Sequence, residues 1–404
     1  MTFNKFCEPG NLKLHNVSSR NAPDFYARDI KPDVGLYSSD LSLTNNSDII
    51  EEAKILHEFK YAPSNDPFQD EVPSFERDTE KACETLGQIT SYATAHMAAQ
   101  FRTHIFSLLV LPKYARLLRW DRAGVVVTKE IPIAGSKSAL AEFYWRYSNA
   151  TPDVRGHDIT VERVWNGVEA EAAREKLKTK MDDKLFRLKL GENGYIVGKP
   201  TYMGVSSPTG RSTRTFTAFC ERNKKLVFLK DTWRVVISGQ LPEHEIYEKL
   251  HKNKVRNIAR LIIGADILEH KTITHEATEI FPNRDFPTFR KFRHYRLALE
   301  DVGHDLRNFS SVKDLVKVIR DATIGKCMVF KQGDYLTSNN VAHVDAFFKA
   351  GVLHRDISTG NIIYLEGGRG LLVDWDLCKV MDSPSEDGEC AIERTVSEQR
   401  YTDT

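Results

Sequence analysis

The sequence lacks the features that mark secreted, membrane-spanning and cysteine-ligated metal proteins. Its six cysteines are scattered, and no two of them have the C-x-x-C spacing of zinc sites and redox dithiols. The N-terminus has no apolar segment of the signal-peptide kind, and the longest apolar run, HIFSLLVL, is far shorter than the roughly 20 residues that span a bilayer. These absences predict an intracellular protein of the cytoplasm or nucleus, with reduced thiols and no membrane partner.

The sequence also lacks an excess of charge of either sign. Lys and Arg together number 57 and Asp and Glu together number 56, which leaves a formal net charge of +1. Composition therefore gives no reason to expect an acidic membrane surface, and nucleic acid is not expected as a partner. The length of 404 residues predicts two or three domains with ample core.

Hydrophobic periodicity divides the chain into four parts and predicts an α+β fold. The first part is polar and aperiodic, and we expect a poorly ordered leader. An α/β domain, a charged connector and a second unit follow. In order, these parts cover residues 1–30, 31–150, 151–200 and 201–404.

A stretch near the C-terminal end carries polar residues at the intervals of a phosphoryl-transfer site. In HRDISTGN, His-Arg-Asp is followed by four residues and Asn. This spacing matches the kinase catalytic loop, in which Asp356 would act as the base and Asn361 as a magnesium ligand. Asp374 follows the apolar strand LLV and opens DWD, where kinases have D-F-G. The hairpin between them predicts that Asn361 and Asp374 meet, and oxygen ligands of this kind suit Mg²⁺.

Together, LHRDIS-x-GNI and LVDWDL resemble the fungal-type protein kinase family, a divergent branch of the protein-kinase superfamily. The resemblance extends over about residues 85–395. It implies a bilobal protein-kinase-like fold, with an N-lobe and hinge over 201–303 and a C-lobe over 304–404, and ATP and Mg²⁺ as cofactors. The other stretches that resemble the family are QFRTHIFSLLV, ARLLRWDRAG, EFYWRYS, RGHDITV, LKDTWR, YEKLHKNKV, HYRLALEDVG and DLVKVIRDA.

The resemblance assigns a role to two charged residues of the N-lobe. Lys230 in the strand VFLKD stands where the phosphate-holding lysine is expected. Its helical partner would be Glu243, counted back from Leu250, with Glu245 and Glu248 as competitors on the same helix.

The remaining nucleotide contacts would come from two loops. The hinge falls near LALEDVG, where Leu299 and Asp301 would meet the adenine. The loop that covers the phosphates falls on TGRSTRT, whose single glycine is Gly210. Kinases use G-x-G-x-x-G there, so this loop departs from the family pattern.

Further departures concern the catalytic residues and the C-lobe. Asp376 replaces the glycine of D-F-G, and Ser358 leaves open whether the acceptor is Ser/Thr or Tyr. A segment at 324–341 interrupts a helix pair, and the chain stops at 396–404 without an A-P-E-like anchor, so the C-lobe is predicted to be incomplete. We interpret both segments as retained intron sequence; the alternative is a genuine insertion and a short C-terminus. Whatever the cause, an incomplete C-lobe leaves the underside of the catalytic loop uncovered, so we expect low stability and little activity.

A second constellation lies in the N-terminal α/β domain. Pro-Asp at Asp33, Glu-x-Lys at Glu58 and Lys60, and Gln-x-x-x-Tyr at Gln88 and Tyr92 follow one another. This order resembles the restriction-endonuclease-like nucleases, in which two carboxylates hold Mg²⁺ and the lysine steadies the attacking hydroxide. Because no basic groove is evident, we expect a nuclease-like fold rather than an active nuclease.

The leading hypothesis is an ATP- and Mg²⁺-dependent protein kinase that phosphorylates Ser/Thr or Tyr hydroxyls of a protein substrate that the sequence does not identify. Two alternatives stay open. One is a pseudokinase that binds ATP and serves as an interaction module. The other is a small-molecule phosphotransferase of kinase-like fold, since such enzymes also use H-x-D and a metal-binding Asp.

Overall fold

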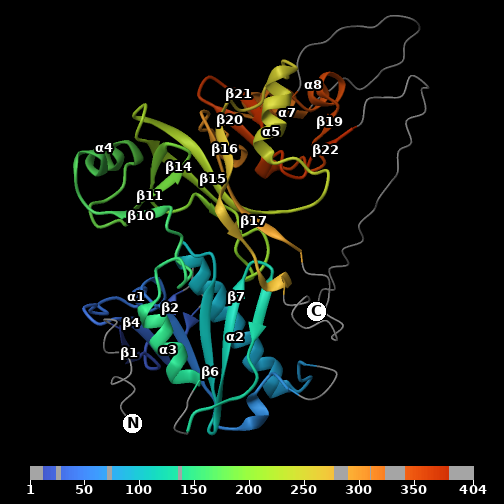
Figure 1. Ribbon diagram of the computed structural model, residues 1–404. Helices are drawn as coiled ribbons and strands as arrows, with labels where there is room; N and C mark the ends of the chain where they lie inside the picture. The colour runs from blue at the N-terminus through green and yellow to red at the C-terminus, as the bar shows by residue number, and fades with distance from the viewer. Residues whose placement is uncertain are drawn as a thin grey trace, which may run out of the picture. The chain divides into compact units, whose positions relative to one another are not determined.

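The computed structural model of the chain (Figure 1) describes residues 12–23, 29–70, 75–134, 139–276, 290–309, 311–323 and 342–381. The predictions for 324–341 and 396–404 lie outside these residues, as does the start of the predicted leader. Helices and strands are mixed throughout, which agrees with the predicted α+β class. The chain forms two compact units. Unit 1 comprises Met1–Gly239 and Leu261–Val302, and unit 2 comprises Gln240–Arg260 and Gly303–Thr404.

The first sheet of unit 1 has seven strands in the order β1-β4-β5-β6-β7-β8, with β9 paired to β7. Neighbouring strands are antiparallel except β5 and β6, which run parallel and are joined through the long helix α2. The strands and helices of this part are β1 Leu12–Asn16, β2 Ala22–Pro23, β3 Asp29–Ile30, β4 Val34–Ser38, α1 Asp48–Glu51, β5 Ile55–Phe59, α2 Glu80–Ala99, β6 Ile105–Val110, β7 Tyr114–Asp121, β8 Gly124–Val127, β9 Ile131–Pro132 and α3 Ala139–Asn149.

The two faces of this sheet are covered by different helices. Successive side chains of a strand point to opposite faces, so Leu108 and Leu109 of β6 enter different cores. Leu108 packs with Tyr144 of α3, whereas Leu109 packs with Met97 of α2. α2 forms because its apolar residues recur at helical spacing over 20 residues without proline.

Part of the predicted leader is a strand of this sheet. Leu12–Asn16 forms β1, which pairs with β4. Leu12 and Leu14 alternate with polar residues, and this period-2 pattern suits an edge strand with one buried face. Because only two apolar residues alternate within a polar segment, the composition of residues 1–30 does not reveal the strand.

The second sheet of unit 1 has the order β10-β11-β12-β14-β15-β17-β16, with β13 paired to β14. All of its pairs are antiparallel, and its core is formed by Tyr195, Phe216 and Leu229 with their neighbours. The charged connector predicted over 151–200 contributes three of these strands. The elements are β10 Val161–Val164, α4 Val168–Leu177, β11 Leu185–Leu190, β12 Asn193–Val197, β13 Tyr202–Met203, β14 Arg214–Cys220, β15 Lys225–Val235, β16 Leu261–Lys271 and β17 Phe292–Leu299.

Unit 2 contains three helices and short antiparallel ladders among its described residues. β20 and β21 form a hairpin closed by Gly367 and Gly368, both at positive φ, and β18 pairs with β20. The elements are α5 Glu243–Lys252, β18 His304–Asp305, α7 Val312–Thr323, α8 Ala342–Ala350, β19 Val352–Leu353, β20 Ile362–Leu365, β21 Arg369–Leu372 and β22 Lys379–Val380.

A membrane-spanning helix is absent from the described part of the chain, where no helix is long and apolar enough to cross a bilayer.

Candidate active site

The catalytic-loop residues lie between β19 and β20 in unit 2. The amide of Asn361 donates to both the backbone carbonyl and the Oδ2 carboxylate oxygen of Asp356, at 2.9 and 3.2 Å. Asn361 ends a short 3₁₀ turn and immediately precedes β20. Its backbone carbonyl accepts from the N–H of Val373 at 3.0 Å, so the hairpin carries the chain back to Asp374. The structure therefore brings Asp356 and Asn361 together and places Asp374 one residue beyond this contact.

The loop is held from beneath by two buried rings. His354 donates through Nε2 to the carbonyl of Val373 at 3.0 Å and accepts from the N–H of Asp356 through Nδ1 at 3.3 Å. Its ring meets the fully buried indole of Trp375 edge to face, with centroids 4.5 Å apart. Burial lowers the pKa of His354, which favours the neutral imidazole whose two hydrogen bonds hold the loop in place.

Three carboxylates converge next to this loop. One oxygen each from Glu243, Asp374 and Asp376 lie within 4.8 Å of one another. Glu243, the first residue of α5, is buried and accepts from the N–H of Trp375 at 3.0 Å, whereas Glu248 is exposed. Asp374 adopts a φ of +66°, in the left-handed region that Asp and Asn tolerate better than most residues. Sequence reasoning treated Asp376 as a departure and did not foresee its place in this cluster.

The charge of the cluster reaches a neighbouring thiol. Burial, followed by the charges of Glu243 and Asp376, raises the pKa of Cys378 to about 12. The thiol therefore stays protonated at neutral pH.

The remaining predicted site residues belong to unit 1. Lys230 is buried on β15, where it pairs in register with Thr215 of β14 and Leu297 of β17. Leu299 ends β17, and both it and Asp301 are buried. Lys230 belongs to unit 1, whereas Glu243 belongs to unit 2.

Gly210 lies in the loop that leads into β14, and its φ of +95° is open to glycine at little cost. Its N–H donates to the carbonyl of Arg122 at 2.8 Å. The same arginine donates to the carbonyl of Pro208, so this loop is tied to the first sheet's β7–β8 turn.

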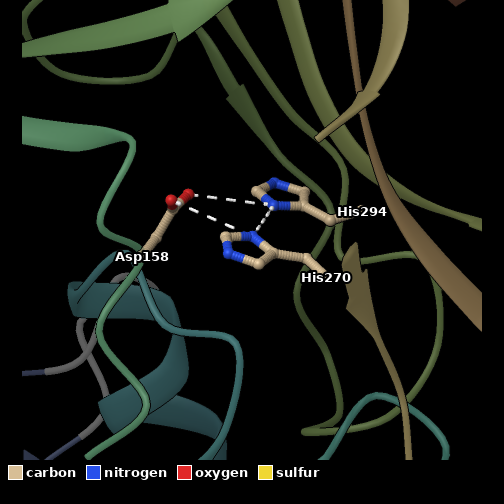
Figure 2. A group of neighbouring side chains, drawn as sticks. All are labelled: Asp158, His270 and His294. Atoms are coloured by element: carbon tan, nitrogen blue, oxygen red, sulfur yellow. Dashed lines mark hydrogen bonds and ion pairs between the residues drawn. The ribbon is translucent and has the colours of Figure 1, made fainter. Parts of the chain in front are cut away.

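A buried charge network in unit 1 escaped the sequence analysis. Asp158, His270 and His294 offer ligand atoms within 4.8 Å of one another, and Figure 2 shows both imidazoles turned toward the carboxylate. The two Nδ1 atoms are 3.3 Å apart, and they lie 4.0 and 3.8 Å from the carboxylate oxygens of Asp158.

This network already contains its cations. Arg296, which is 0% exposed, donates to Asp158 at 2.6 Å and to Asp231 at 2.7 Å. His294 Nε2 lies 2.8 Å from the same Asp231 oxygen. The adjacent guanidinium of Arg214 adds further positive charge, as its effect on the pKa of Asp231 indicates. A metal ion would meet this positive charge, so we interpret the network as structural. Asp158 comes from RGHDITV, Asp231 from LKDTWR, and His294 and Arg296 from HYRLALEDVG, which could have signalled that these stretches converge.

The five residues of the second constellation are also brought together in unit 1. Asp33 precedes β4, Glu58 and Lys60 lie at the end of β5, and Gln88 and Tyr92 stand one turn apart on α2. Lys60 donates to Glu58 at 2.7 Å and to Gln88 at 2.6 Å, and Gln88 donates to the Tyr92 hydroxyl at 2.7 Å.

A sequence profile of the family described as fungal protein kinase matches residues 72–293 and 272–397, which together span most of the chain. The chain belongs to the fungal protein kinase family. Membership indicates kinase activity in general, and with it a use of ATP and a divalent metal. A comparison with curated proteins finds no match for the chain. The region that the family profile matches begins before α2 and includes the whole second sheet, the catalytic loop and the acidic cluster of Glu243, Asp374 and Asp376.

Proposed function

We propose that this chain transfers the γ-phosphoryl group of ATP to Ser/Thr or Tyr hydroxyls of a protein, with Asp356 as the base. The observation that carries the proposal is the contact between Asn361 and Asp356 at the open end of the β20–β21 hairpin. Asp374 directly follows Val373, whose N–H donates to the Asn361 carbonyl at that same end. In kinases the base, the distal Asn and the second metal-binding Asp have these roles.

The donor set suits a magnesium ion. Asn361 uses its amide nitrogen toward Asp356, which leaves its carbonyl oxygen for a cation. Asp374 adds a carboxylate, and Asp376 and Glu243 lie beside it. Hard cations of this kind prefer oxygen ligands. When bound, magnesium would neutralise phosphate charge and align the nucleotide.

Each protein group then has a simple task. Asp356 accepts the proton of the substrate hydroxyl. The hydroxyl oxygen bonds to the γ-phosphorus, and the bond between the γ-phosphorus and the β-phosphate oxygen breaks. The hydrogen bond from Asn361 fixes the carboxylate that receives this proton. Lys230 would hold the phosphates, Leu299 and Asp301 would contact the adenine, and Gly210 would lie over the phosphates.

A second candidate is an ATP-binding interaction module without turnover. Two observations favour it. The N–H of Gly210 is already engaged by Arg122, so it is not available to cradle a phosphate in this arrangement. Asp376 also replaces the glycine that gives D-F-G its backbone freedom.

Binding and transfer assays on the full chain separate these candidates. We expect ATP with Mg²⁺ to raise the melting temperature, Asp374→Asn to abolish this rise, and Glu366→Gln, an exposed change in the same hairpin, to preserve it. Transfer of labelled γ-phosphate to protein, lost by a factor of about a hundred or more in Asp356→Asn, supports the kinase. Binding without transfer supports the interaction module, and transfer to small hydroxyl compounds alone supports a small-molecule phosphotransferase. If the chain shows no ATP binding and no transfer, the proposal is contradicted.

A further inference from the structure

A cavity of about 600 Å³ in unit 1 has no part in the proposed phosphoryl transfer. Its walls come from the residue that precedes β5, the end of α2, the segment between α3 and β10, and the strands β10 and β11. Segments that are distant in sequence therefore meet around it. A cavity of this size is typical of sites that bind small molecules.

One side of the cavity carries charges that are already paired. Lys184 donates to Glu51 at 2.6 Å and to Glu52 at 2.9 Å, and Arg163 lies 3.6 Å from Glu52. The carboxylate of Asp158 belongs to the buried network described above, where both imidazoles turn toward it (Figure 2). All three carboxylates that line the cavity are therefore engaged.

The other side carries cations without a counterion among the described residues. The ammonium of Lys54 forms neither a hydrogen bond nor an ion pair there. Arg155 donates to the carbonyl of Ser148 at 2.5 Å, but its Nε is buried and has no partner in the described structure. The ring of His157 also forms no hydrogen bond with a described residue. Buried donors without partners cost free energy, which a bound acceptor would recover.

A further cation lies behind these three side chains. Arg102 is 4% exposed and donates to the side chain of Gln100 and to the carbonyls of Ala53 and Arg155, so it brings a positive charge without an anion. Burial lowers the pKa of Lys54, and the charges of Arg102 and Arg155 lower it further, against the effect of nearby acids.

The same charges act on the imidazole. Burial, followed by the charges of Arg102 and Lys54, lowers the pKa of His157 to about 2. Cations that disfavour one another in this way are stabilised when an anion lies between them.

The cavity also has an apolar wall. Phe101 and Phe186 both line it, and their ring centroids are 5.2 Å apart. Ile159, which is 51% exposed, borders the same space. The combination of cations and aromatic rings suits an anion that carries an apolar group.

We propose that this cavity binds a small phosphomonoester, with its phosphate against Lys54, Arg155 and His157 and its organic part against Phe101 and Phe186. A phosphomonoester carries close to two negative charges at neutral pH, which matches the two unpaired cations of the lining, whereas a carboxylate carries one. The ammonium and the guanidinium donate charge-assisted hydrogen bonds to phosphate oxygens, and the neutral imidazole donates one N–H. The site uses none of the residues assigned to phosphoryl transfer, so the two proposals are independent.

Binding is tested by isothermal titration calorimetry of the nucleotide-free full chain with phenyl phosphate. EDTA is present, so that the proposed metal-dependent ATP site does not contribute. We expect Lys54→Met and Arg155→Met each to weaken binding by at least about tenfold, because each removes a charge-assisted hydrogen bond. Lys81→Met, which removes an exposed lysine of α2 outside the cavity, is the matched control and should bind like the parent.

A charge-preserving variant separates ligand binding from a structural role. Lys54→Arg should bind phenyl phosphate within about threefold of the parent, since the guanidinium also donates to phosphate. Phenyl phosphate should raise the melting temperature of the parent but not that of Lys54→Met. Circular dichroism checks that each variant is folded, and Lys54→Gln takes the place of Lys54→Met if the latter is not. No binding by the parent, or equal affinity in the parent and both charge-removing variants, would overturn the proposal.

Two further ligands test the chemical class. Inorganic phosphate should bind at least about tenfold more weakly than phenyl phosphate, because it leaves the apolar wall uncovered. Benzoate should also bind at least about tenfold more weakly, because its single charge leaves one cation without a counterion. If inorganic phosphate bound as tightly as phenyl phosphate, the ligand would not be an ester; if benzoate did, it would not be a phosphate. Either result contradicts the assignment.

Discussion

Carboxylates gather in two regions of the molecule, and their surroundings differ. In unit 1, Asp158 and Asp231 share the buried guanidinium of Arg296, and His294 completes the network. In unit 2, Glu243, Asp374 and Asp376 converge on one another, and Glu243 also accepts from the backbone N–H of Trp375. Charges that are already paired hold elements of a fold together. Carboxylates that face one another oppose folding and are suited to attract a cation.

The largest expected effect tests whether Arg296 holds unit 1 together. Arg296→Met removes the cation and leaves two buried carboxylates, so we expect the free energy of unfolding to fall by about 3–5 kcal/mol. Urea denaturation followed by tryptophan fluorescence measures the change. Arg146→Met is the control, because the Arg146–Glu142 pair is 72% and 59% exposed and should matter by less than about 1 kcal/mol. If Arg296→Met and Arg146→Met lowered the free energy of unfolding equally, the Arg296 network would not hold unit 1 together.

Acid should weaken unit 1 through histidines before it reaches the Arg296 network. Burial lowers the pKa of His57 to about 4 and that of His96 to about 3. Below about pH 6.5 the unfolded chain binds protons that these folded imidazoles refuse, so stability present at pH 7 is lost as pH falls. For His57 alone the loss by pH 4 is on the order of 3 kcal/mol. The pKa of Asp231 is lowered, mainly by His294 and Arg296 against the effect of burial, so the network stays ionised in this range.

Unfolding measured between pH 7 and pH 4 checks this order of events. His57→Gln should flatten the pH dependence, whereas His304→Gln, an exposed histidine of unit 2, should leave it unchanged. If stability held constant down to pH 4, the buried imidazoles would have to be charged in the folded protein, against their surroundings.

The smallest difference comes from one substitution made in both regions. Asp231→Asn weakens two charge-assisted hydrogen bonds and should cost about 2–3 kcal/mol. Asp374→Asn keeps the shape of the side chain at a left-handed φ that Asn adopts readily, so its cost should be smaller than that of Asp231→Asn. Chemical denaturation of both variants gives the comparison directly. A cost at Asp374 as large as that at Asp231 would mean that the acidic cluster is a structural element.

Features that depend on short sequence distances were the ones predictable from sequence. The spacing of Asp356, Asn361 and Asp374 predicted a hairpin between the last two, and β20 and β21 form it. The P-D, E-x-K and Q-x-x-x-Y order lies on a strand pair and the helix that follows, so periodicity could anticipate its assembly.

Features that depend on strand order and distant contacts could not be predicted in the same way. Asp158 meets His270 and His294 only because β17 lies between β15 and β16, and β16 carries register shifts that periodicity does not reveal. The convergence of Asp376 with Glu243 joins residues that are far apart in sequence. A single sequence contains no direct signal for such pairs, since side-chain period fixes a face but not a partner.

The division of unit 1 into two chain segments has a consequence for synthesis on the ribosome. β15 ends before Gly239, but its partner β17 begins at Phe292 and lies beyond the segment that belongs to unit 2. At about 5–20 residues per second, the nascent chain waits for several seconds with one edge of β15 unpaired. The unpaired edge of β15, which is 11 residues long, can pair with another chain and so promote aggregation. Slow translation over residues 240–291 would prolong this exposure, so the yield of folded protein should depend on the speed of elongation there.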